Sequence, residues 1–279
     1  MLRRMLGRTS GGASGFRFLH DEISGGVSAY SHLKSSAAYS GSVVSIGTNS
    51  TDYGFLDNIV DISQIIADYP ANASFYRYYD QLGSNNIEKP TGFLNGWNIN
   101  NGDTFFKSSQ FNGAMNVIPT GGLAAIGSGA FTIMVVFITP SAFTQEYIFE
   151  TDSNTSFRLY YLNASRFTWR FGTFGGDMIE WDNIPLDFTP NKRQLLCFTY
   201  DGSETAGGMK CYQNDMTTEI SGGSKNSSGS FSNFAFMTSN LDLGTSKGVV
   251  EDLHFFNKVL NQSDREKAKE ILEQYYTFS

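Results

Sequence analysis

Two carboxylates on one predicted strand are the best local candidates for chemistry. Glu150 and Asp152 stand two residues apart, after Tyr147 and Phe149. On a strand, residues two apart share a face, and their Cα atoms lie about 6.6 Å apart at a rise of ~3.3 Å per residue. Glycoside hydrolases use two carboxyl groups, about 5–5.5 Å apart when they retain configuration and about 6.5–9.5 Å apart when they invert it. A solvated strand face opposite buried Tyr147 and Phe149 explains the pattern better, so no residue is assigned a catalytic role.

Tryptophans in polar surroundings are candidates for stacking on a sugar ring. Trp181 lies between two acids in a predicted loop beyond Gly175-Gly176, and Trp97 lies in a run of Asn and Gly. Trp169 alternates with Phe, so we expect it in the core. For Trp181, core packing is slightly favoured over ligand stacking. The candidate carbohydrate-binding residues are Trp181, Trp97, Glu150 and Asp152.

Metal ligands are sparse in this sequence. The histidines, His20, His32 and His254, are far apart and lack a ligand spacing such as HExxH, so no metal site is predicted. Asn214 and Asp215 offer oxygen ligands of the kind that Ca²⁺ takes, but the pattern is nonspecific. No cofactor is expected, with Ca²⁺ left open.

The first 17 residues carry four arginines and no acid: Arg3, Arg4, Arg8 and Arg17. Because the whole chain carries −7, the remaining residues carry −11. A basic arm on an acidic body indicates docking on a negatively charged partner, and a frayed Gly/Ser-rich terminus is an equally good explanation. The overall acidity disfavours nucleic-acid binding, which needs clustered Lys and Arg.

The amino terminus does not read as a signal peptide. Residues 1–8 resemble a basic n-region, but Thr9-Ser10-Gly11-Gly12 follows where an apolar segment should be. No apolar run approaches the roughly 20 residues that span a bilayer, so no membrane partner is expected.

Alternation of apolar and polar residues with a period of two predicts the strands that position the candidate residues. Residues 131–138, 147–150, 157–161, 166–171, 194–200 and 209–213 are predicted strands. The aromatic faces of 157–161 and 166–171 should point inward, leaving Arg158, Arg166 and Arg170 in water. Many short strands joined by Gly, Asn and Ser turns predict an all-β antiparallel sandwich or jelly roll.

Few other elements are predicted. Ser263 and Glu266 form a capping box that opens a carboxy-terminal helix, and a second short helix is predicted over residues 57–69. Residues 221–232 are predicted to be a surface loop. Cys197 and Cys211 flank a predicted hairpin, and unpaired buried thiols are favoured over a disulfide.

Three segments carry distinctive motifs: residues 29–34 (AYSHLK) with 38–44 (AYSGSVV), residues 78–83 (YYDQLG), and residues 111–113 (FNG). Together they resemble the catalytic domain of fungal alpha-L-arabinofuranosidase B, which has WYDQSG and FDG at the last two, a module that also occurs in many phage structural proteins. From residue 131 onward the chain resembles a laminin-G/concanavalin A-like domain, with FTYDG at 198–202 and a typical ending at 251–266. The resemblance implies a single concanavalin A-like jelly-roll domain over residues 20–279, preceded by an arm of residues 1–19.

One segment departs from the family. Its basic run, VRVRRSSDN, corresponds here to residues 44–50 (VSIGTNS), which contain no arginine. This departure puts hydrolase activity in doubt. The family's catalytic carboxylates have no identified counterparts in this sequence, so none is carried over. The strand-end motif at 78–81 is expected to hold the amino-terminal segment against the sandwich.

The resemblance and the arm together predict a non-enzymatic structural protein of a phage virion: a capsid decoration, fibre or tail appendage subunit. It would be made in the host cytoplasm, anchored to other virion proteins by the arm, self-associated as a homo-oligomer, and able to contact host-surface glycans. Two alternatives remain open: an arabinofuranosidase-like glycoside hydrolase and a free carbohydrate-binding module.

Overall fold

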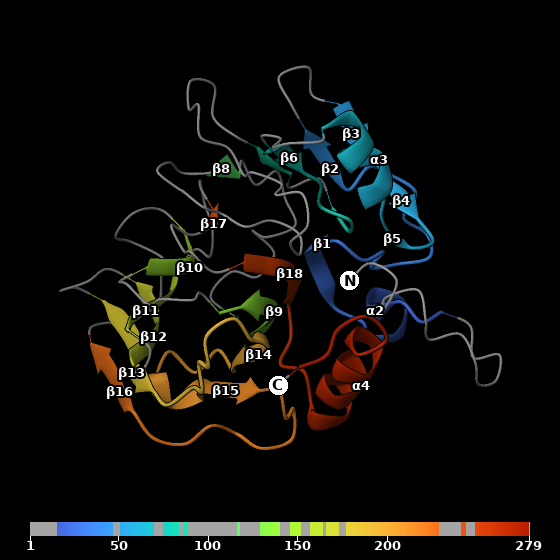
Figure 1. Ribbon diagram of the computed structural model, residues 1–279. Coiled ribbons are helices and arrows are strands. Elements are labelled where there is room, and N and C mark those ends of the chain that lie inside the picture. The colour runs from blue at the N-terminus through green and yellow to red at the C-terminus, as the bar shows by residue number, and fades with distance from the viewer. Residues whose placement is uncertain are drawn as a thin grey trace.

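The protein is an all-β antiparallel sandwich with a short carboxy-terminal helix (Figure 1). The computed structural model describes residues 16–46, 51–69, 75–83, 86–88, 116–117, 129–139, 146–151, 157–163, 166–172, 177–228, 241–243 and 249–278. Every pairing between described strands is antiparallel. The predicted fold class is confirmed.

Two sheets form the sandwich. The first runs in the order β1 (Gly26–Ser31), β18 (Val249–Phe256), β9 (Phe131–Ile138), β14 (Arg193–Tyr200), β15 (Met209–Gln213). The second runs in the order β16 (Ser224–Ser228), β13 (Met178–Ile184), β12 (Arg166–Gly172), β11 (Phe157–Asn163), β10 (Glu146–Thr151), β17 (Leu241–Leu243).

Aromatic side chains from facing strands fill the space between the two sheets. Trp169 of β12 is fully buried, and its ring centroid lies 5.1 Å from that of Phe198 on β14. Phe167 stacks on the same Phe198, and Phe131 of β9 packs edge-on against Phe171. The inward orientation predicted for these side chains of β12 is confirmed, because a period of two sends alternate residues to one face.

The first sheet is covered on its other face as well. Met134, Val136 and Leu195 pack there with Ala268 and Ile271 of α4 (Gln262–Leu272). The short helix α2 (Leu19–Glu22) adds Leu19 to the same cluster. Burial on both faces explains why β9 is an uninterrupted apolar run rather than an alternating one.

The cap of α4 differs from the prediction. Asn261 is the N-cap residue, and its side-chain oxygen accepts a hydrogen bond from the Asp264 backbone N–H at 2.9 Å. Ser263, predicted as the cap, already lies inside the helix. Asn and Ser are similarly good caps, so the sequence pattern alone did not separate the two positions.

The second predicted helix is shorter than expected. α3 spans Ile62–Asp68 and is capped by Asp61. The preceding residues instead form a hairpin of β4 (Phe55–Leu56) and β5 (Ile59–Val60). Asp57 and Asn58 form its two-residue turn with φ of 51° and 68°, as tight hairpin turns require.

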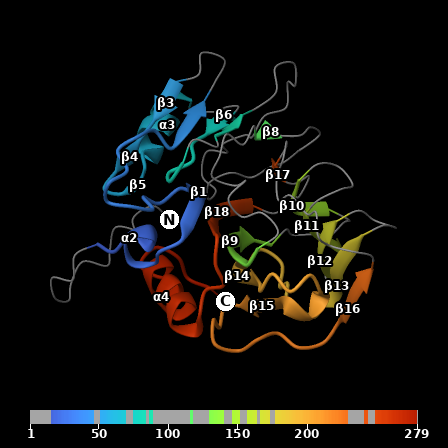
Figure 2. The ribbon, with the colours of Figure 1, turned by 180° about the vertical axis from the view of Figure 1, so that it is seen from behind.

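A further sheet packs beside the sandwich, at the upper left of Figure 2. Its order is β3 (Thr51–Tyr53), β2 (Val44–Ile46), β6 (Phe75–Tyr78), β7 (Ile87–Glu88), β8 (Asn116–Val117). Val44, Ile46 and Tyr78 of this sheet belong to the same buried cluster as the aromatic core of the sandwich.

The prediction of a surface loop over residues 221–232 is partly wrong. Within it, residues Ser224–Ser228 form β16, which pairs with β13 at the edge of the second sheet. All five residues are exposed. A strand without a buried face has no apolar alternation, so periodicity could not reveal it.

Cys197 and Cys211 are free thiols, as the sequence favoured. Phe198 pairs with Cys211 and Cys197 pairs with Tyr212, which places the two thiols on opposite faces of the first sheet. Burial raises the pKa of Cys197 to about 12 and also raises the pKa of Cys211.

We therefore expect native protein to react with an aromatic disulfide reagent only as fast as the sheet opens, because the thiolate is the nucleophile. The absorbance of the released aromatic thiolate should show that two protein thiols react at once in denaturant and slowly without it. Rapid modification of either thiol in native protein would contradict the placement.

Candidate functional site

The outer face of the second sheet carries a row of polar and charged residues that crosses its strands. The register aligns Arg158 of β11, Arg170 of β12, Glu180 of β13 and Asn226 of β16, and it continues through Glu150 of β10. The opposite face of the same strands is aromatic core. Alternation therefore gathers polar residues from β11, β12, β13 and β16 on one surface.

Arg170 is the central side chain of this row. Only 5% of the residue is exposed, so the prediction that it lies in water is wrong, whereas Arg166 is exposed as predicted. Its guanidinium lies 3.6 Å from the Glu180 carboxylate and 5.7 Å from the centre of the Tyr160 ring. A side chain in the middle of a six-stranded sheet is shielded by neighbours on both sides, which the sequence of one strand does not show.

Asp182 lies two residues beyond Glu180 on the same face of β13. Arg166 donates to its carboxylate at 2.7 Å, Asn183 donates at 3.1 Å, and the Thr168 hydroxyl also donates to it. This carboxylate is thus held by side chains from β12 and β13.

The pKa values of the Glu180 and Asp182 carboxyl groups are shifted in opposite directions. Burial raises the pKa of Glu180, although Arg170 opposes the shift. Burial also acts to raise the pKa of Asp182, but hydrogen bonds from Arg166 and Thr168 outweigh it and the pKa is lowered. The environments of these two carboxyls therefore move their pKa values in opposite directions on one surface.

Trp181 lies between these acids but points the other way. It is 1% exposed within the core, and its indole N–H donates to the Gly222 carbonyl at 2.8 Å. The Lys225 ammonium lies 4.0 Å from the ring centre. Trp181 lies on strand β13, not in the predicted loop, so it packs in the core and offers no ring face to a sugar.

The other sequence candidates are only partly described. Glu150 lies on β10 in the cross-strand row, opposite Arg158. Asp152 and Trp97 lie outside the described residues. Glu180 and Asp182 were not predicted as site residues, although they alternate with buried Ile179 and Trp181 and so mark the polar face of β13.

Arg17 is the one arginine of the basic arm that the structure describes. Its guanidinium pairs with Glu22 at 2.5 Å and with Glu270 of α4 at 2.8 Å. Nearby, Phe16 packs edge-on against Tyr275. Arg17 therefore binds its own body, whereas Arg3, Arg4 and Arg8 lie outside the described residues.

The Asn214-Asp215 pair forms a turn. The Asp215 carboxylate accepts hydrogen bonds from the Thr217 backbone and hydroxyl and from the Thr218 hydroxyl. The side-chain oxygen of Asn214 accepts from the Leu195 N–H at 2.9 Å. Within the described residues, no three His, Cys, Asp or Glu side chains gather as metal ligands.

The strand-end motif at 78–81 holds the edge of β1. The Asp80 carboxylate accepts the N–H of Ala29 and of Leu82, each at 3.0 Å. The Gln81 backbone N–H donates to the Ala29 carbonyl, and its side-chain amide donates to the Ser31 carbonyl. The expected role, holding the amino-terminal segment on the sandwich, is confirmed.

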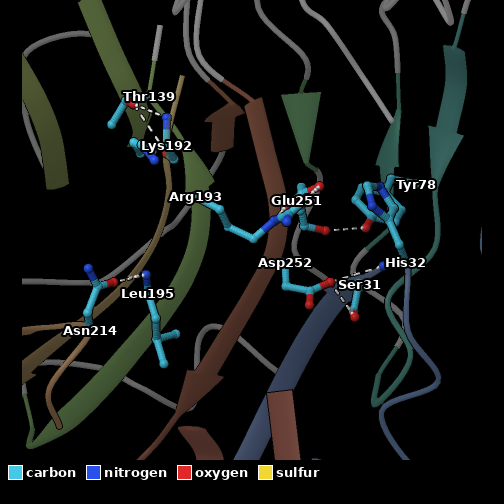
Figure 3. A network of polar contacts seen from close by, with 10 residues as sticks. All are labelled: Ser31, His32, Tyr78, Thr139, Lys192, Arg193, Leu195, Asn214, Glu251 and Asp252. Carbon is cyan, nitrogen blue, oxygen red and sulfur yellow. Dashed lines mark hydrogen bonds and ion pairs between the residues drawn. The ribbon is translucent and has the colours of Figure 1, made fainter. Parts of the chain in front are cut away.

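A second polar cluster is buried where β1, β18 and the further sheet meet (Figure 3). Glu251 receives a two-point hydrogen bond from Arg193, and the Tyr78 hydroxyl donates to the Glu251 carbonyl. The Asp252 carboxylate accepts from the Ser31 hydroxyl and the His32 N–H. Since these residues are buried, this cluster stabilises the junction rather than offering a binding surface.

Comparison with known proteins identifies the fold. No family model matches the sequence, and no curated protein matches it. A GH54 α-L-arabinofuranosidase soaked with a cyclic sulfate inhibitor has a TM-score of 0.56 at 14% identity, over 91% of this chain and 64% of that one. The likeness shows a shared fold.

Two botulinum neurotoxin structures are also similar. The serotype DC binding domain in complex with rat synaptotagmin II has a TM-score of 0.49 at 12% identity, over 83% of this chain and 52% of that one. The serotype C1 binding domain has a TM-score of 0.43 at 14% identity, over 56% and 40%. The chain spans between 40% and 64% of the length of these three structures.

No helix in the described ranges combines the length and the apolar character needed to cross a bilayer.

Proposed function

We propose that this protein is a non-enzymatic structural subunit of a virion whose sandwich contacts glycans through the outer face of its second sheet. The observation that carries the glycan-binding role is the surface formed by Tyr160, Arg166, Thr168, Glu180 and Asp182. It combines fixed hydrogen-bond donors, carboxylate acceptors and a half-buried aromatic ring, the groups that orient polar ligands in binding sites.

The arginines support binding without catalysis. Arg170 and Arg166 each pair with one carboxylate of the site. A paired carboxylate is held in a defined position and keeps lone pairs for ligand hydroxyls, but its charge is already partly compensated. The virion role is supported by the resemblance to phage structural modules and by the basic arm on an acidic body.

Glycan binding is expected on an array and with soluble arabinofuranosyl oligosaccharides. Arg166→Ala should weaken binding on the order of tenfold, as expected when a charged hydrogen-bond donor is lost from a site. Gln262→Ala, an exposed change on α4, should leave affinity unchanged. Equal affinity for all three proteins would contradict the site.

A glycoside hydrolase is the second candidate, favoured by the opposite pKa shifts of Glu180 and Asp182. Release of the aryl group from an aryl α-L-arabinofuranoside, abolished by Glu180→Gln or Asp182→Asn, would establish it. The proposed binding role expects no turnover above a buffer control, even at high protein concentration.

The arm can be tested separately from the sandwich. Deleting residues 1–15 removes Arg3, Arg4 and Arg8 but keeps the contacts of Phe16 and Arg17 with the body. The truncated protein should fold normally and fail to enter particles. Unchanged incorporation would exclude the tether while leaving glycan binding untouched.

A further inference from the structure

The short helix α2 fastens the amino-terminal segment to the sandwich. It lies between β1 and α4 in both Figure 1 and Figure 2. Leu19 packs in the buried cluster that α4 shares, the His20 N–H donates to the Ser35 carbonyl at 2.9 Å, and the Asp21 carboxylate accepts the Ala37 N–H at 2.8 Å. A short helix held in this way can open locally while the sheets stay folded.

Two histidines meet where α2 rests on the first sheet. Nε2 of His20 lies 3.1 Å from Nδ1 of His254 on β18, and the His20 ring stacks on Phe256 with the ring centres 5.0 Å apart. The other ring nitrogens, Nδ1 of His20 and Nε2 of His254, are buried and have no hydrogen-bond partner among the described residues. A neutral imidazole has one N–H and one lone pair, so a single shared hydrogen joins the pair.

An added proton finds no acceptor in this pair. The first must go to one of the two unpartnered nitrogens, and a second would set N–H against N–H across the 3.1 Å contact. At Nδ1 of His20 the space is already closed, because a Cβ atom on Gly26 would overlap this nitrogen. Burying a charge without a partner is costly, so the closed arrangement holds only neutral rings.

The carboxyl group nearest along β18 does not offset that cost. Asp252 lies two residues from His254 on the same face of β18, and burial raises its pKa to about 8, so it is neutral in acid. Burial lowers the pKa of both histidines of the pair, and His20 lowers the pKa of His254 further.

The other titratable groups of the surrounding elements have contacts of their own. Those of β1, β6, α2, α4 and the connecting segments are Arg17, Asp21, Glu22, His32, Lys34, Asp80, Lys258, Glu270, Tyr275 and Tyr276. Arg17 pairs with Glu22 and Glu270. Asp80 accepts the Ala29 N–H, and Lys258 pairs with Asp264. His32 stacks on Tyr78, and Lys34 lies over the Phe18 ring.

We propose that α2 is an acid-released strap: His20 and His254 take up protons only when residues 16–24 lift off the sandwich, which itself stays folded. Gly25 is the hinge, with a φ of 87° and a carbonyl that accepts the Asn257 N–H at 2.9 Å and so keeps the following strand in place. The released segment would extend over about 30 Å at ~3.3 Å per residue. This inference does not rest on glycan binding.

The size of the response follows from the two imidazoles. In the released strap each has its ordinary pKa near 6.5, whereas in the closed pair neither is charged. The ratio of open to closed strap should therefore rise on the order of 10³-fold between pH 7.5 and pH 5, with about 30-fold from each histidine. The pair of Arg17 and Glu22 persists over this range, because Arg17 lowers the pKa of Glu22.

Hydrogen exchange of the full-length protein, read by mass spectrometry and corrected for the intrinsic effect of pH, tests the strap. Protection of the His20 and Ile23 amides, which bond to Ser35 and Leu19, should fall by about a hundredfold or more from pH 7.5 to pH 5. Amides of β14 should remain the better protected at both pH values. A common opening constant for α2 and β14 at pH 5, or undiminished protection of α2, would overturn the proposal.

Two amides in place of the histidines test the protons themselves. Glutamine carries its amide near the Nε2 position and asparagine near the Nδ1 position. His20→Gln combined with His254→Asn can therefore keep one hydrogen bond across the contact, but it cannot take up a proton. The double variant should show the same protection of α2 at pH 5 and pH 7.5, and each single change should leave about a 30-fold response.

A control on the same helix removes a different titratable group. Asp21→Asn keeps an oxygen for the Ala37 N–H and should show the full response to pH. A double variant that responds as steeply as the unmodified protein, or an Asp21→Asn protein that no longer responds, would overturn the proposal.

Discussion

Replacing Glu251 by alanine should lower the free energy of unfolding by about 3–5 kcal/mol, the usual cost of leaving a buried ionic partner unpaired. Glu251 is 3% exposed, and it receives Nε of Arg193 at 2.5 Å and Nη2 at 2.9 Å. Arg193 also lies 5.0 Å from the centre of the Tyr276 ring. Because Arg193 retains 17% side-chain exposure, water reduces its penalty and the lower end of the range is expected.

Chemical unfolding of three variants separates the ion pair from simple loss of volume. Glu251→Gln keeps the shape and one acceptor, so it should cost less than Glu251→Ala. The double variant of Glu251→Ala with Arg193→Ala should cost less than the two single changes added together, since it leaves no unpaired charge. Strict additivity would show that the two side chains act independently.

The second large effect is a maximum of stability near pH 7. Burial lowers the pKa of His20 to about 3 and lowers the pKa of His32 and His254 well below the ordinary value. His20 and His254 also face each other at 3.1 Å. The unfolded chain therefore binds more protons than the native one below about pH 6.5, and stability falls as the solution is acidified.

Asp252 acts in the opposite direction. Burial raises its pKa to about 8, against hydrogen bonds from Ser31 and the His32 backbone, with the Glu251 charge adding to the rise. The native state keeps this proton while the unfolded state has lost it above about pH 4. Between about pH 7 and 8, as the unfolded histidines lose their protons, stability should fall with rising pH by less than the one-proton limit of about 1.4 kcal/mol per pH unit.

Urea unfolding measured at a series of pH values checks both slopes. Asp252→Asn imitates the protonated carboxyl and keeps an oxygen for Ser31 and His32. It should remove the decline between pH 7 and 8 and steepen the decline below pH 6.5, because the proton kept by native Asp252 no longer offsets those taken up by the unfolded histidines. A variant that declines in alkali as steeply as the unmodified protein would show that Asp252 is ionised in the native state.

The aromatic core could be predicted from the sequence because it depends on local periodicity. The alternation of Phe167, Trp169 and Phe171 predicted an inward face, and that face is buried. The motif at 78–81 was likewise predicted to hold the amino-terminal segment, as Asp80 does at Ala29. Strand period and turn chemistry are properties of a few neighbouring residues, so one segment is enough to reveal them.

The candidate site could be predicted from the sequence only in part. Glu150 was chosen for its spacing from Asp152, and the register places it in the polar row. Glu180 and Asp182 were passed over in favour of Trp181, which was predicted to lie in a loop. Which arginine pairs with which acid depends on the order of strands β11, β12 and β13. The sequence of a single strand does not reveal that order.

By itself, the amino-acid sequence determined the all-β class, the aromatic inner face and the acidic body, because these follow from composition and period. The tertiary structure alone decided that Trp181 is core, that Arg170 is shielded between Tyr160 and Glu180, and that residues Ser224–Ser228 form strand β16. Each of these depends on neighbours distant in sequence, whose positions are set by strand order and register rather than by local preference.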